Sequence, residues 1–466
     1  MERCVIIKQS EENNMEKLKQ KSSRALRPAT IIALSFLALI FVGAFLFTLP
    51  FMTRDGKGLS FFTGLFTATS SVCVTGLTVI DPAVTLSRYG QVLLAVLIEI
   101  GGISMVTFAT FLLFTFRKRS GFKSIRLAQE YTNLDALSQV KSLVRTIVTT
   151  AFFCQLAGAL LLCIRFVPKL GPKGIWVSVF TAISAYCNAG FDLFGIEKEY
   201  GSLINYNGDP LVMYVVMALI ITGGIGFYVF YDLIHFRKTR HISLHTKVVT
   251  VTSLILILVG FVSVLLFEHA NPLTLGKLST GEKFTAALFQ SVTTRTAGFC
   301  SVDIASLHDV TKIIMMFLMF IGAGSGSTGG GIKVTTFAVI AMTVVSVIKN
   351  RGDTVIYGKK VDKKVVYKSM TIAMLGLVGI FIAVCFILID LPDANGIDVF
   401  FEGVSAFATV GLSSGITAEV GKIGLSALIA LMYIGRLGPI CFIAALNVRE
   451  EKSRLTVLPE GKIMVG

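Results

Sequence analysis

The stretch CVTGLTVID, residues 73–81, has a small, polar and flexible centre inside a segment that is otherwise apolar. It closes a run without charged residues, 58–80, that is long enough to enter a bilayer, and it ends on the turn signal Asp-Pro. Three related stretches follow downstream: CNAGF at 187–191, RTAGF at 295–299 and ATVGL at 408–412. Because the interruption recurs, it predicts a structural role that all four copies share.

The four glycines of these stretches mark an internal repeat. Gly76, Gly190, Gly298 and Gly411 are separated by 114, 108 and 113 residues. Bulky apolar residues stand ten positions before each glycine, and in the first three copies also fourteen positions before it. Since a spacing of four is typical of one face of a helix, each glycine is expected to end a short helix of about three turns. These apolar residues are Phe66, Phe180, Leu288 and Phe401, preceded by Phe62, Trp176 and Phe284.

Composition indicates an integral membrane protein. Of the 466 residues, 54% are hydrophobic and 15% are charged, and the mean hydropathy is +0.77. Soluble domains carry about 25% charged residues. A membrane-spanning helix needs about 20 apolar residues, and several runs without charged residues reach this length. They include 28–53, 146–164, 210–231, 248–267, 313–332 and 369–389.

The charged residues indicate topology. Basic residues concentrate in four segments, whereas the connections 192–209 and 390–402 are acidic. Since basic loops stay in the cytoplasm, all four segments and both termini are expected there, although a basic patch on a soluble face is the alternative for any single loop. The net charge of +15 therefore does not predict nucleic-acid binding. The basic segments are 1–27, 117–145, 237–247 and 349–368.

Repeat and charge together predict an all-α integral membrane protein with four pseudo-fourfold repeats around one central pore. Each repeat is a helix, a re-entrant pore loop and a second helix, which makes eight spanning helices. The polar start and the full-length first apolar run predict no cleaved signal peptide. The predicted boundaries are 1–27 for a basic cytoplasmic tail, 28–120, 121–240, 241–350 and 351–448 for the repeats, and 449–466 for a cytoplasmic C-terminal tail.

Four such loops around one axis would form a path for a cation. Irregular backbone at membrane depth is tolerated where it lines a water-filled path. The C-terminal ends of the short helices carry partial negative charge, and carbonyl oxygens can replace the hydration shell of an ion. The alternative, that each glycine only closes a helix, explains four matched positions less well.

The loops also resemble a known family. SSVCVTGLTVID (70–81), SAYCNAGFDLFG (184–195), SVTTRTAGF (291–299) and SAFATVGLSSG (405–415) are similar to the four filter loops of the Trk/Ktr/HKT superfamily of potassium transporters. The length is closest to the bacterial Ktr-type membrane subunit. The resemblance implies a channel-like potassium transporter of the cell membrane, often influenced by sodium, that forms a homodimer with one pore in each subunit. It further implies a cytoplasmic ring of nucleotide-binding subunits that gates the pore.

The resemblance assigns an ion-binding filter to the backbone around each glycine, with potassium as the transported ion. Relatives with serine at the first of these glycines favour sodium, so Gly76 implies a preference for potassium. With a single glycine in each loop, a short filter with few ion sites is expected. The predicted filter residues are Val74, Thr75, Gly76, Asn188, Ala189, Gly190, Thr296, Ala297, Gly298, Thr409, Val410 and Gly411.

The stretch GAGSGSTGGGIK, residues 322–333, predicts a break in a later apolar segment. Glycine costs about 1 kcal/mol per residue in a helix, so this stretch should unwind, and its hydroxyl groups can satisfy the freed backbone. The family carries an intramembrane gating loop here; a close-packing glycine face is the alternative. The predicted gate comprises Gly322, Gly324, Ser325, Gly326, Ser327, Thr328, Gly329, Gly330, Gly331, Lys333 and Arg436.

Three charged residues stand inside apolar segments. Arg436 is expected below the filter, near the gate, and Glu99 could pair with it because the first and fourth repeats would be neighbours. The alternative for Glu99 is a protonated or backbone-bonded carboxyl group. Arg295 is expected at the base of the third loop, where it either tethers the loop to an acidic residue or meets the ion.

Other function classes fit less well. All five histidines lie in loops, and no nucleophile, base and orienting group are in reach of one another, so an enzyme is not expected. A scaffold would not need four glycine-ended loops, whereas a sodium-coupled or sodium-selective transporter is a closer alternative. No cofactor is expected in this chain, and nucleotide would act only through a partner. The basic loops 117–145 and 349–368 suit either that partner or anionic membrane lipids.

Overall fold

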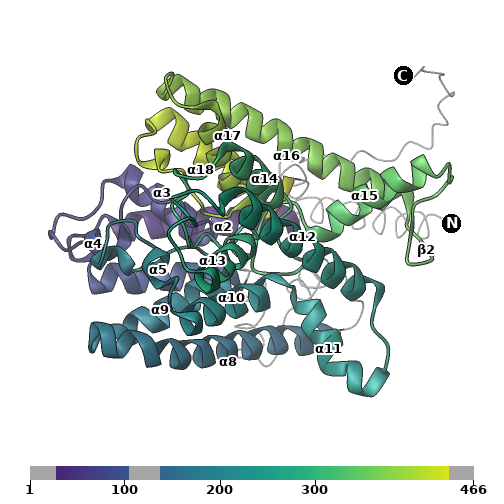
Figure 1. Cartoon of the computed structure of the whole chain (residues 1–466), viewed down its shortest axis with the longest axis horizontal. Coiled ribbons are helices and arrows are strands. Elements are labelled where there is room, and N and C mark those ends of the chain that lie inside the picture. The colour runs from purple at the N-terminus through teal and green to yellow at the C-terminus, as the bar shows by residue number, and fades with distance from the viewer. Residues whose placement is uncertain (1–27, 104–136, 440–466) are drawn as a thin grey trace, which may run out of the picture.

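The computed structural model describes residues 28–103 and 137–439, whose regular structure is almost entirely helical. A long helix, a short helix that leads to one of the four loop glycines, and a third helix follow one another four times (Figure 1). The long helices are α2 (Pro28–Phe47), α8 (Leu137–Leu170), α12 (Leu244–Glu268) and α16 (Lys363–Asp390). The short helices are α3 (Phe61–Val72), α9 (Lys173–Cys187), α13 (Thr280–Thr293) and α17 (Gly396–Ala408). The third members are α5 (Arg88–Gly102), α10 (Pro210–Gly224), α14 (Asp309–Phe320) and α18 (Lys422–Leu437).

A few smaller elements complete the described part of the chain. The helices α4 (Pro82–Thr85), α11 (Phe227–Thr239) and α15 (Val334–Ile348) connect the larger elements. Strands β1 (Val355–Ile356) and β2 (Lys359–Lys360) form an antiparallel hairpin between α15 and α16. The predicted N-terminal tail, most of the basic segment 117–145 and the C-terminal tail lie outside the described residues.

Among the described residues, four helices are long and apolar enough to cross a membrane, and a bent pair raises the number to five. The four are the long helices α2, α8, α12 and α16, and the pair is α10 with α11, bent by 93°. The third helix of each group is too short by itself, because α14 stops at Phe320 and α10 turns at Gly226, which has a φ of 103°. Helix length and composition therefore account for at most five membrane spans among the described residues, and not for the eight predicted from sequence.

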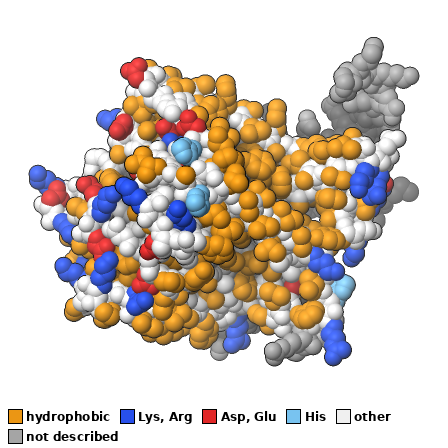
Figure 2. All heavy atoms as spheres, in the orientation of Figure 1, with side chains coloured by type: hydrophobic (Ala, Val, Ile, Leu, Met, Phe, Trp, Pro, Cys, Tyr) orange, Lys and Arg blue, Asp and Glu red, His pale blue; other side chains and the backbone are white. Residues whose placement is uncertain are grey.

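The outer surface is apolar where a bilayer would contact it. Large side chains on the long helices are exposed, among them Phe45 (61%), Leu160 (62%), Leu254 (68%) and Phe381 (61%). Figure 2 shows a broad hydrophobic zone across the middle of the molecule, with charged side chains gathered at its two ends. Apolar surface of this extent is unusual in a soluble monomer and marks contact with lipid. The chain is thus a multi-pass membrane protein.

The short helices are the most buried part of the fold. Phe66, Phe180 and Phe401 are at most 1% exposed, as the spacing predicted. In α13 the fully buried residue is Phe289, whereas Leu288, ten positions before Gly298, is only partly buried. The cause lies at the end of the helix. The amide of Ala297, just before Gly298, donates to the carbonyl of Thr293, four residues earlier. In each of the other three loops, the amide just before the glycine donates to a carbonyl five residues earlier. The third helix is therefore shifted by one residue relative to its glycine.

Candidate functional site

The four loop glycines lie in a closed ring. Each glycine packs against the carbonyl oxygen that precedes the next glycine in the chain, and the fourth loop closes on the first. A Cβ atom on Gly76 would lie only 2.5 Å from the carbonyl oxygen of Ala189. The remaining contacts join Gly190 to Ala297, Gly298 to Val410 and Gly411 to Thr75. Backbone segments more than one hundred residues apart in the sequence are thus in direct contact, and a larger residue than glycine does not fit.

A second residue in each loop has left-handed backbone. It stands two positions before the glycine, and three of the four residues are β-branched, for which a positive φ is a genuine outlier. Each such position costs about 1–3 kcal/mol and persists where the surrounding structure enforces it, often at functional sites. Nothing in the sequence predicted a left-handed conformation at these four residues. The φ values are 56° for Val74, 58° for Asn188, 69° for Thr296 and 50° for Thr409.

The ends of the short helices determine the direction of the loop carbonyls. In the first loop, the amide of Val74 donates to Ser71 and that of Thr75 to Ser70, which is the Schellman closure of a helix. The second and fourth loops close in the same way. The amide of Gly76 also donates to the Ser70 hydroxyl, at 3.1 Å. Because N–H and C=O of a trans peptide point in opposite directions, the carbonyls of Val74 and Thr75 point away from the helix.

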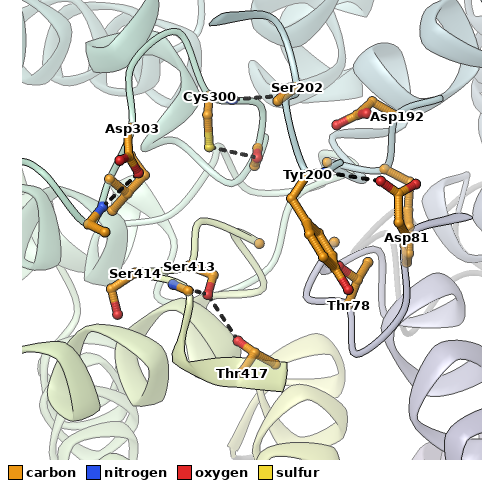
Figure 3. Close-up of a pocket in the computed structure, with 18 of the residues that line it drawn as sticks. Thr78, Asp81, Asp192, Tyr200, Ser202, Cys300, Asp303, Ser413, Ser414 and Thr417 are labelled. Atoms are coloured by element: carbon orange, nitrogen blue, oxygen red, sulfur yellow. Dashed lines mark hydrogen bonds between the residues drawn. The ribbon is translucent and has the colours of Figure 1, made fainter. Parts of the chain in front are cut away.

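On one side of the ring, a cavity of about 260 Å³ has the four glycines among its lining residues. We call it the vestibule. Figure 3 shows that acidic and hydroxyl side chains from all four loops surround it. Asp81, Asp192 and Asp303 supply negative charge, which attracts cations. Burial, together with the negative charge of Asp81, raises the pKa of Asp192 to about 6.

The vestibule wall is held by buried polar residues that sequence reasoning missed. Glu402, in α17, is fully buried and accepts hydrogen bonds from the amide of Ser414 (3.0 Å) and the hydroxyl of Thr417 (2.7 Å). In the third loop, Gln290 accepts a bond from the amide of Ser301 at 3.3 Å. The sequence does contain an indication of this contact. Glu402 is an acidic residue in the apolar segment before Gly411, and hydroxyl residues follow that glycine. These contacts fix the chain just beyond the ring.

Below the ring, on the side opposite the vestibule, the chain from Ile321 to Lys333 is irregular, as the glycine-rich sequence predicted. Gly329 and Gly330 are buried directly against the side chains of Thr296 and Thr409, two of the left-handed ring residues. We call this segment, 321–333, the intramembrane loop. It occupies the space immediately beneath the ring.

Backbone contacts hold the intramembrane loop on two sides. The amide of Gly322 donates to the carbonyl of Ile332 at 2.8 Å, which pairs the two ends of the loop. The amide of Gly324 donates to the carbonyl of Gly224 at 2.9 Å, and the amide of Phe227 donates to that of Gly326 at 2.8 Å. The loop therefore rests on the end of α10, where the chain turns into α11.

The side chains of the loop follow the sequence prediction only in part. Thr328 donates to a backbone carbonyl, that of Tyr186, at 3.3 Å, and Lys333 donates to the carbonyl of Gly329 at 2.5 Å. Ser325 instead contacts the hydroxyl of Thr335 at 2.6 Å. The buried hydroxyl of Ser327 has no partner among the described residues. Gly331 packs against Ala408 at the end of α17.

Arg436 lies at the loop, but it does not pair with Glu99. Its guanidinium donates to the carbonyl oxygens of Thr328 and Gly101, and it thereby joins the intramembrane loop to α5. The carboxylate of Glu99 accepts bonds from Gln155 at 2.9 Å and from the thiol of Cys187 at 3.3 Å. The predicted ion pair is therefore wrong. Side chains of α8 and α9, which lie beside α5, supply the partners instead.

Arg295 also departs from the prediction. It is 8% exposed, at the base of the third loop. Of the ion pairs found among residues 28–103 and 137–439, none joins Arg295 to an acidic residue. The side chain lines a small cavity between α10 and α12. The predicted acidic tether is thus not found in the described part of the chain.

Comparison with known proteins adds the family. The family model described as "TrkH: Cation transport protein" matches residues 4–454. The Ktr system potassium uptake protein B of Bacillus subtilis is 38% identical over 440 residues, which cover 94% of this chain and 97% of that protein. The potassium/sodium uptake protein NtpJ of Enterococcus hirae is 37% identical, with 96% and 99% covered.

A solved structure shares the fold. The crystal structure of the potassium transporter TrkH from Vibrio parahaemolyticus superposes with a TM-score of 0.68 and covers 90% of this chain and 84% of that chain. At 19% sequence identity, this likeness bears on the fold alone.

Proposed function

This chain belongs to the TrkH family of cation transport proteins, and on that premise we propose that it takes up potassium through a channel-like pore. The observation that carries the proposal is the closed ring of four loops, in which carbonyl groups point away from the short helices. Carbonyl oxygens arranged in this way replace the water around a dehydrated potassium ion. The acidic vestibule raises the local concentration of cations in front of the ring.

The proposed architecture is four pseudo-fourfold repeats with eight spans and both termini in the cytoplasm. The fourfold recurrence of a long helix, a short helix and a third helix supports it, as does the ring that the four loops form. In this architecture α10 crosses the membrane together with α11, and α14 crosses together with the intramembrane loop that follows it. We keep the repeat boundaries expected from the sequence.

The intramembrane loop is proposed as the gate. It lies directly under the ring, where it blocks the path of an ion, and Arg436 holds it through the carbonyl of Thr328. Because the loop has no helical hydrogen bonds of its own, a small change in its anchors can move it.

Regulation is proposed to come from a second kind of subunit. The relatives from Bacillus subtilis are named as proteins of a Ktr system, which supports a transporter built from several components. We propose a homodimer on a cytoplasmic nucleotide-binding ring. Sodium is the second candidate ion, as an activator or as a transported ion, because NtpJ is named a potassium/sodium uptake protein.

Rubidium uptake into proteoliposomes tests the pore directly. In a Cys300→Ala background, Thr78→Cys places a thiol in the vestibule, and a positively charged methanethiosulfonate is expected to block uptake there. Potassium should slow the block. Leu273→Cys, at an exposed site away from the vestibule, is the matched control. Uptake that continues after complete modification of Thr78→Cys would contradict this path.

A further inference from the structure

The vestibule has features that the passage of potassium alone does not require. All of its charged lining residues are acidic, and Asp81, Asp192 and Asp303 come from three different loops. No lysine, arginine or histidine lines the cavity, so its negative potential attracts cations of any kind. Its volume of about 260 Å³ is far larger than the roughly 10–15 Å³ that one water molecule needs. The cavity therefore has room for a cation of many atoms.

The three carboxylates are not arranged to enclose a small metal ion. Asp81 accepts hydrogen bonds from the amides of Ala83 at 2.8 Å and Tyr200 at 3.0 Å, which fix its position. Asp303 is likewise fixed, by an amide and a hydroxyl of its own loop. Calcium needs six to eight oxygen ligands at about 2.3–2.6 Å, and no three acidic, histidine or cysteine side chains are grouped as metal ligands in the described part of the chain. The carboxylates thus supply a diffuse negative charge.

A tyrosine with left-handed backbone presents its ring to this charge. Tyr200 lines the vestibule, is 52% exposed, and extends its side chain towards Thr78 (Figure 3). Its φ of 55° is a genuine outlier for a bulky residue, and the bond from its amide to Asp81 helps to hold it. The cations found over aromatic rings among the described residues lie over Trp176 and Tyr206. No cation of the described chain therefore covers the ring of Tyr200.

The rest of the lining includes apolar side chains, among them Pro82, Ile204, Val302 and Ile304. The buried hydroxyl of Ser414, another lining residue, has no partner among the described residues. Alkyl groups are stabilised when apolar surface is removed from water, and a cation is attracted to the face of an aromatic ring. A metal ion can use the charge and the ring, whereas an alkylated ammonium ion can use the charge, the ring and the apolar lining.

We propose that the vestibule binds small organic ammonium ions that carry alkyl groups. The charged nitrogen lies between the ring of Tyr200 and the carboxylates, and the alkyl groups pack on the apolar lining. Because Gly76 and the other three ring glycines line the same cavity, a bound ammonium ion lies in the path of potassium. It therefore inhibits uptake from the vestibule side in competition with potassium. Inhibition rests on the proposed pore, whereas binding does not.

Calorimetric titration of the purified full-length protein tests the binding, with tetraethylammonium chloride as the ligand in potassium-free buffer. Saturable binding is expected, and added potassium should weaken it. Lithium chloride at equal ionic strength is the control and should bind more weakly, because lithium has no alkyl groups to bury. Absence of saturable tetraethylammonium binding, or equal binding of lithium, would overturn the proposal.

Rubidium uptake into proteoliposomes separates this site from the pore. Tetraethylammonium on the vestibule side should raise the rubidium concentration for half-maximal uptake and leave the maximal rate unchanged. Binding without any effect on uptake would support the site and contradict the proposed path. In the Cys300→Ala background, tetraethylammonium should also slow the modification of Thr78→Cys by the charged methanethiosulfonate, but not that of Leu273→Cys. Equal slowing at both positions, or none at Thr78→Cys, would place the ligand outside the vestibule.

Two variants of Tyr200 assign the role of the ring. Tyr200→Leu keeps apolar bulk without an aromatic face and should weaken tetraethylammonium binding by about threefold or more. Tyr200→Phe keeps the face and should bind like the wild type. Tyr214→Leu, at a half-exposed tyrosine of α10 outside the vestibule, is the matched control. Unchanged affinity in folded Tyr200→Leu would contradict the ring contact, and if this variant does not fold, the protection of Thr78→Cys still decides.

Discussion

At the scale of the residue, Gly76 shows why the ring needs glycine. Its φ is 94°, and a Cβ atom would lie 2.5 Å from the carbonyl oxygen of Ala189. A side chain there must displace a carbonyl that the proposed filter uses. Asp192, at the rim of the vestibule, acts through charge instead, and burial raises the pKa of its carboxyl to about 6. The two residues give separate tests of the pore.

Gly76→Ser is expected to lower the preference for potassium over sodium by about fivefold or more, because losing one well-placed ligand costs about 1 kcal/mol or more. The measurement is the ratio of rubidium to sodium uptake in proteoliposomes. Gly379→Ser is the control, since a Cβ at Gly379 makes only an ordinary contact, 3.4 Å from Leu431. An unchanged ratio in Gly76→Ser, with normal amounts of folded protein, would contradict the filter.

Asp192→Asn is expected to reduce potassium uptake at neutral pH and to raise Tm. The pKa of Asp192 is raised above that of an unfolded aspartate, about 3.9, so the folded state loses stability as pH rises from about 4 to about 6. Asparagine removes this loss. The gain in Tm over the wild type should be full at about pH 7.5 and smaller at about pH 5. A gain in Tm that grows as the pH falls would contradict a raised pKa of Asp192.

The ring glycines could be predicted from sequence because a small residue that recurs at matched positions in apolar runs indicates a shared structural role. The left-handed backbone of Val74 and Thr409 could not be predicted, since tertiary packing enforces it against local preference. The sequence also led us to pair Glu99 with Arg436, although Gln155 and Cys187 lie closer. Which groups meet around a buried charge depends on how helices pack, and that information is not local in the sequence.

At the scale of the element, the break between α14 and α15 creates the intramembrane loop. Clustered glycines disfavour helix there, so the break could be predicted from sequence. The offset of α13 by one residue could not be, since it comes from a different closure of the helix end. The sharp bend between α10 and α11 could not be predicted from sequence either, because it occurs at a single glycine, Gly226, inside a continuous apolar run.

Shortening the intramembrane loop within 324–330, or Arg436→Ala, is expected to raise basal potassium flux severalfold. Arg436→Ala removes the bonds that join the loop to α5. Flux should be measured with and without the regulatory subunit, whose effect should become weaker. Arg165→Ala, which removes an exposed arginine that pairs with Asp209 near the end of α8, is the control. If the shortened loop leaves both rates as they were, the segment is a packing face and not a gate.

At the scale of the whole molecule, the chain closes on itself. The hydroxyl of Tyr433 in α18 donates to the carbonyl of Ala33 in α2 at 2.6 Å, across 400 residues of sequence. Gly435 packs against the backbone of Phe407, and Arg436 bonds to Gly101. The expected neighbourhood of the first and fourth groups is therefore confirmed. The ring can form only when the last group has folded against the first.

The end of the molecule that carries the hairpin is the proposed docking surface for a regulatory subunit. The hairpin lies where α15 ends and α16 begins, away from the pore loops (Figure 1). Lys359 and Lys364 are exposed there, and the ion pair between Lys360 and Asp353, at 2.7 Å, holds the hairpin. Exposed lysines suit an acidic partner surface and equally suit anionic lipid, so the experiment has to separate the two.

Purification from the native membrane is expected to recover a soluble nucleotide-binding protein together with this chain. The double charge reversal Lys359→Glu and Lys364→Glu should weaken that association at least tenfold, because like charges then face each other at the interface. Lys283→Glu, which changes a lysine outside the hairpin, is the matched control. Lipid binding alone would leave the copurified protein in place after charge reversal. Nucleotide-sensitive flux from the isolated chain in pure liposomes would show that no such partner is needed, since regulation would then reside in this chain itself.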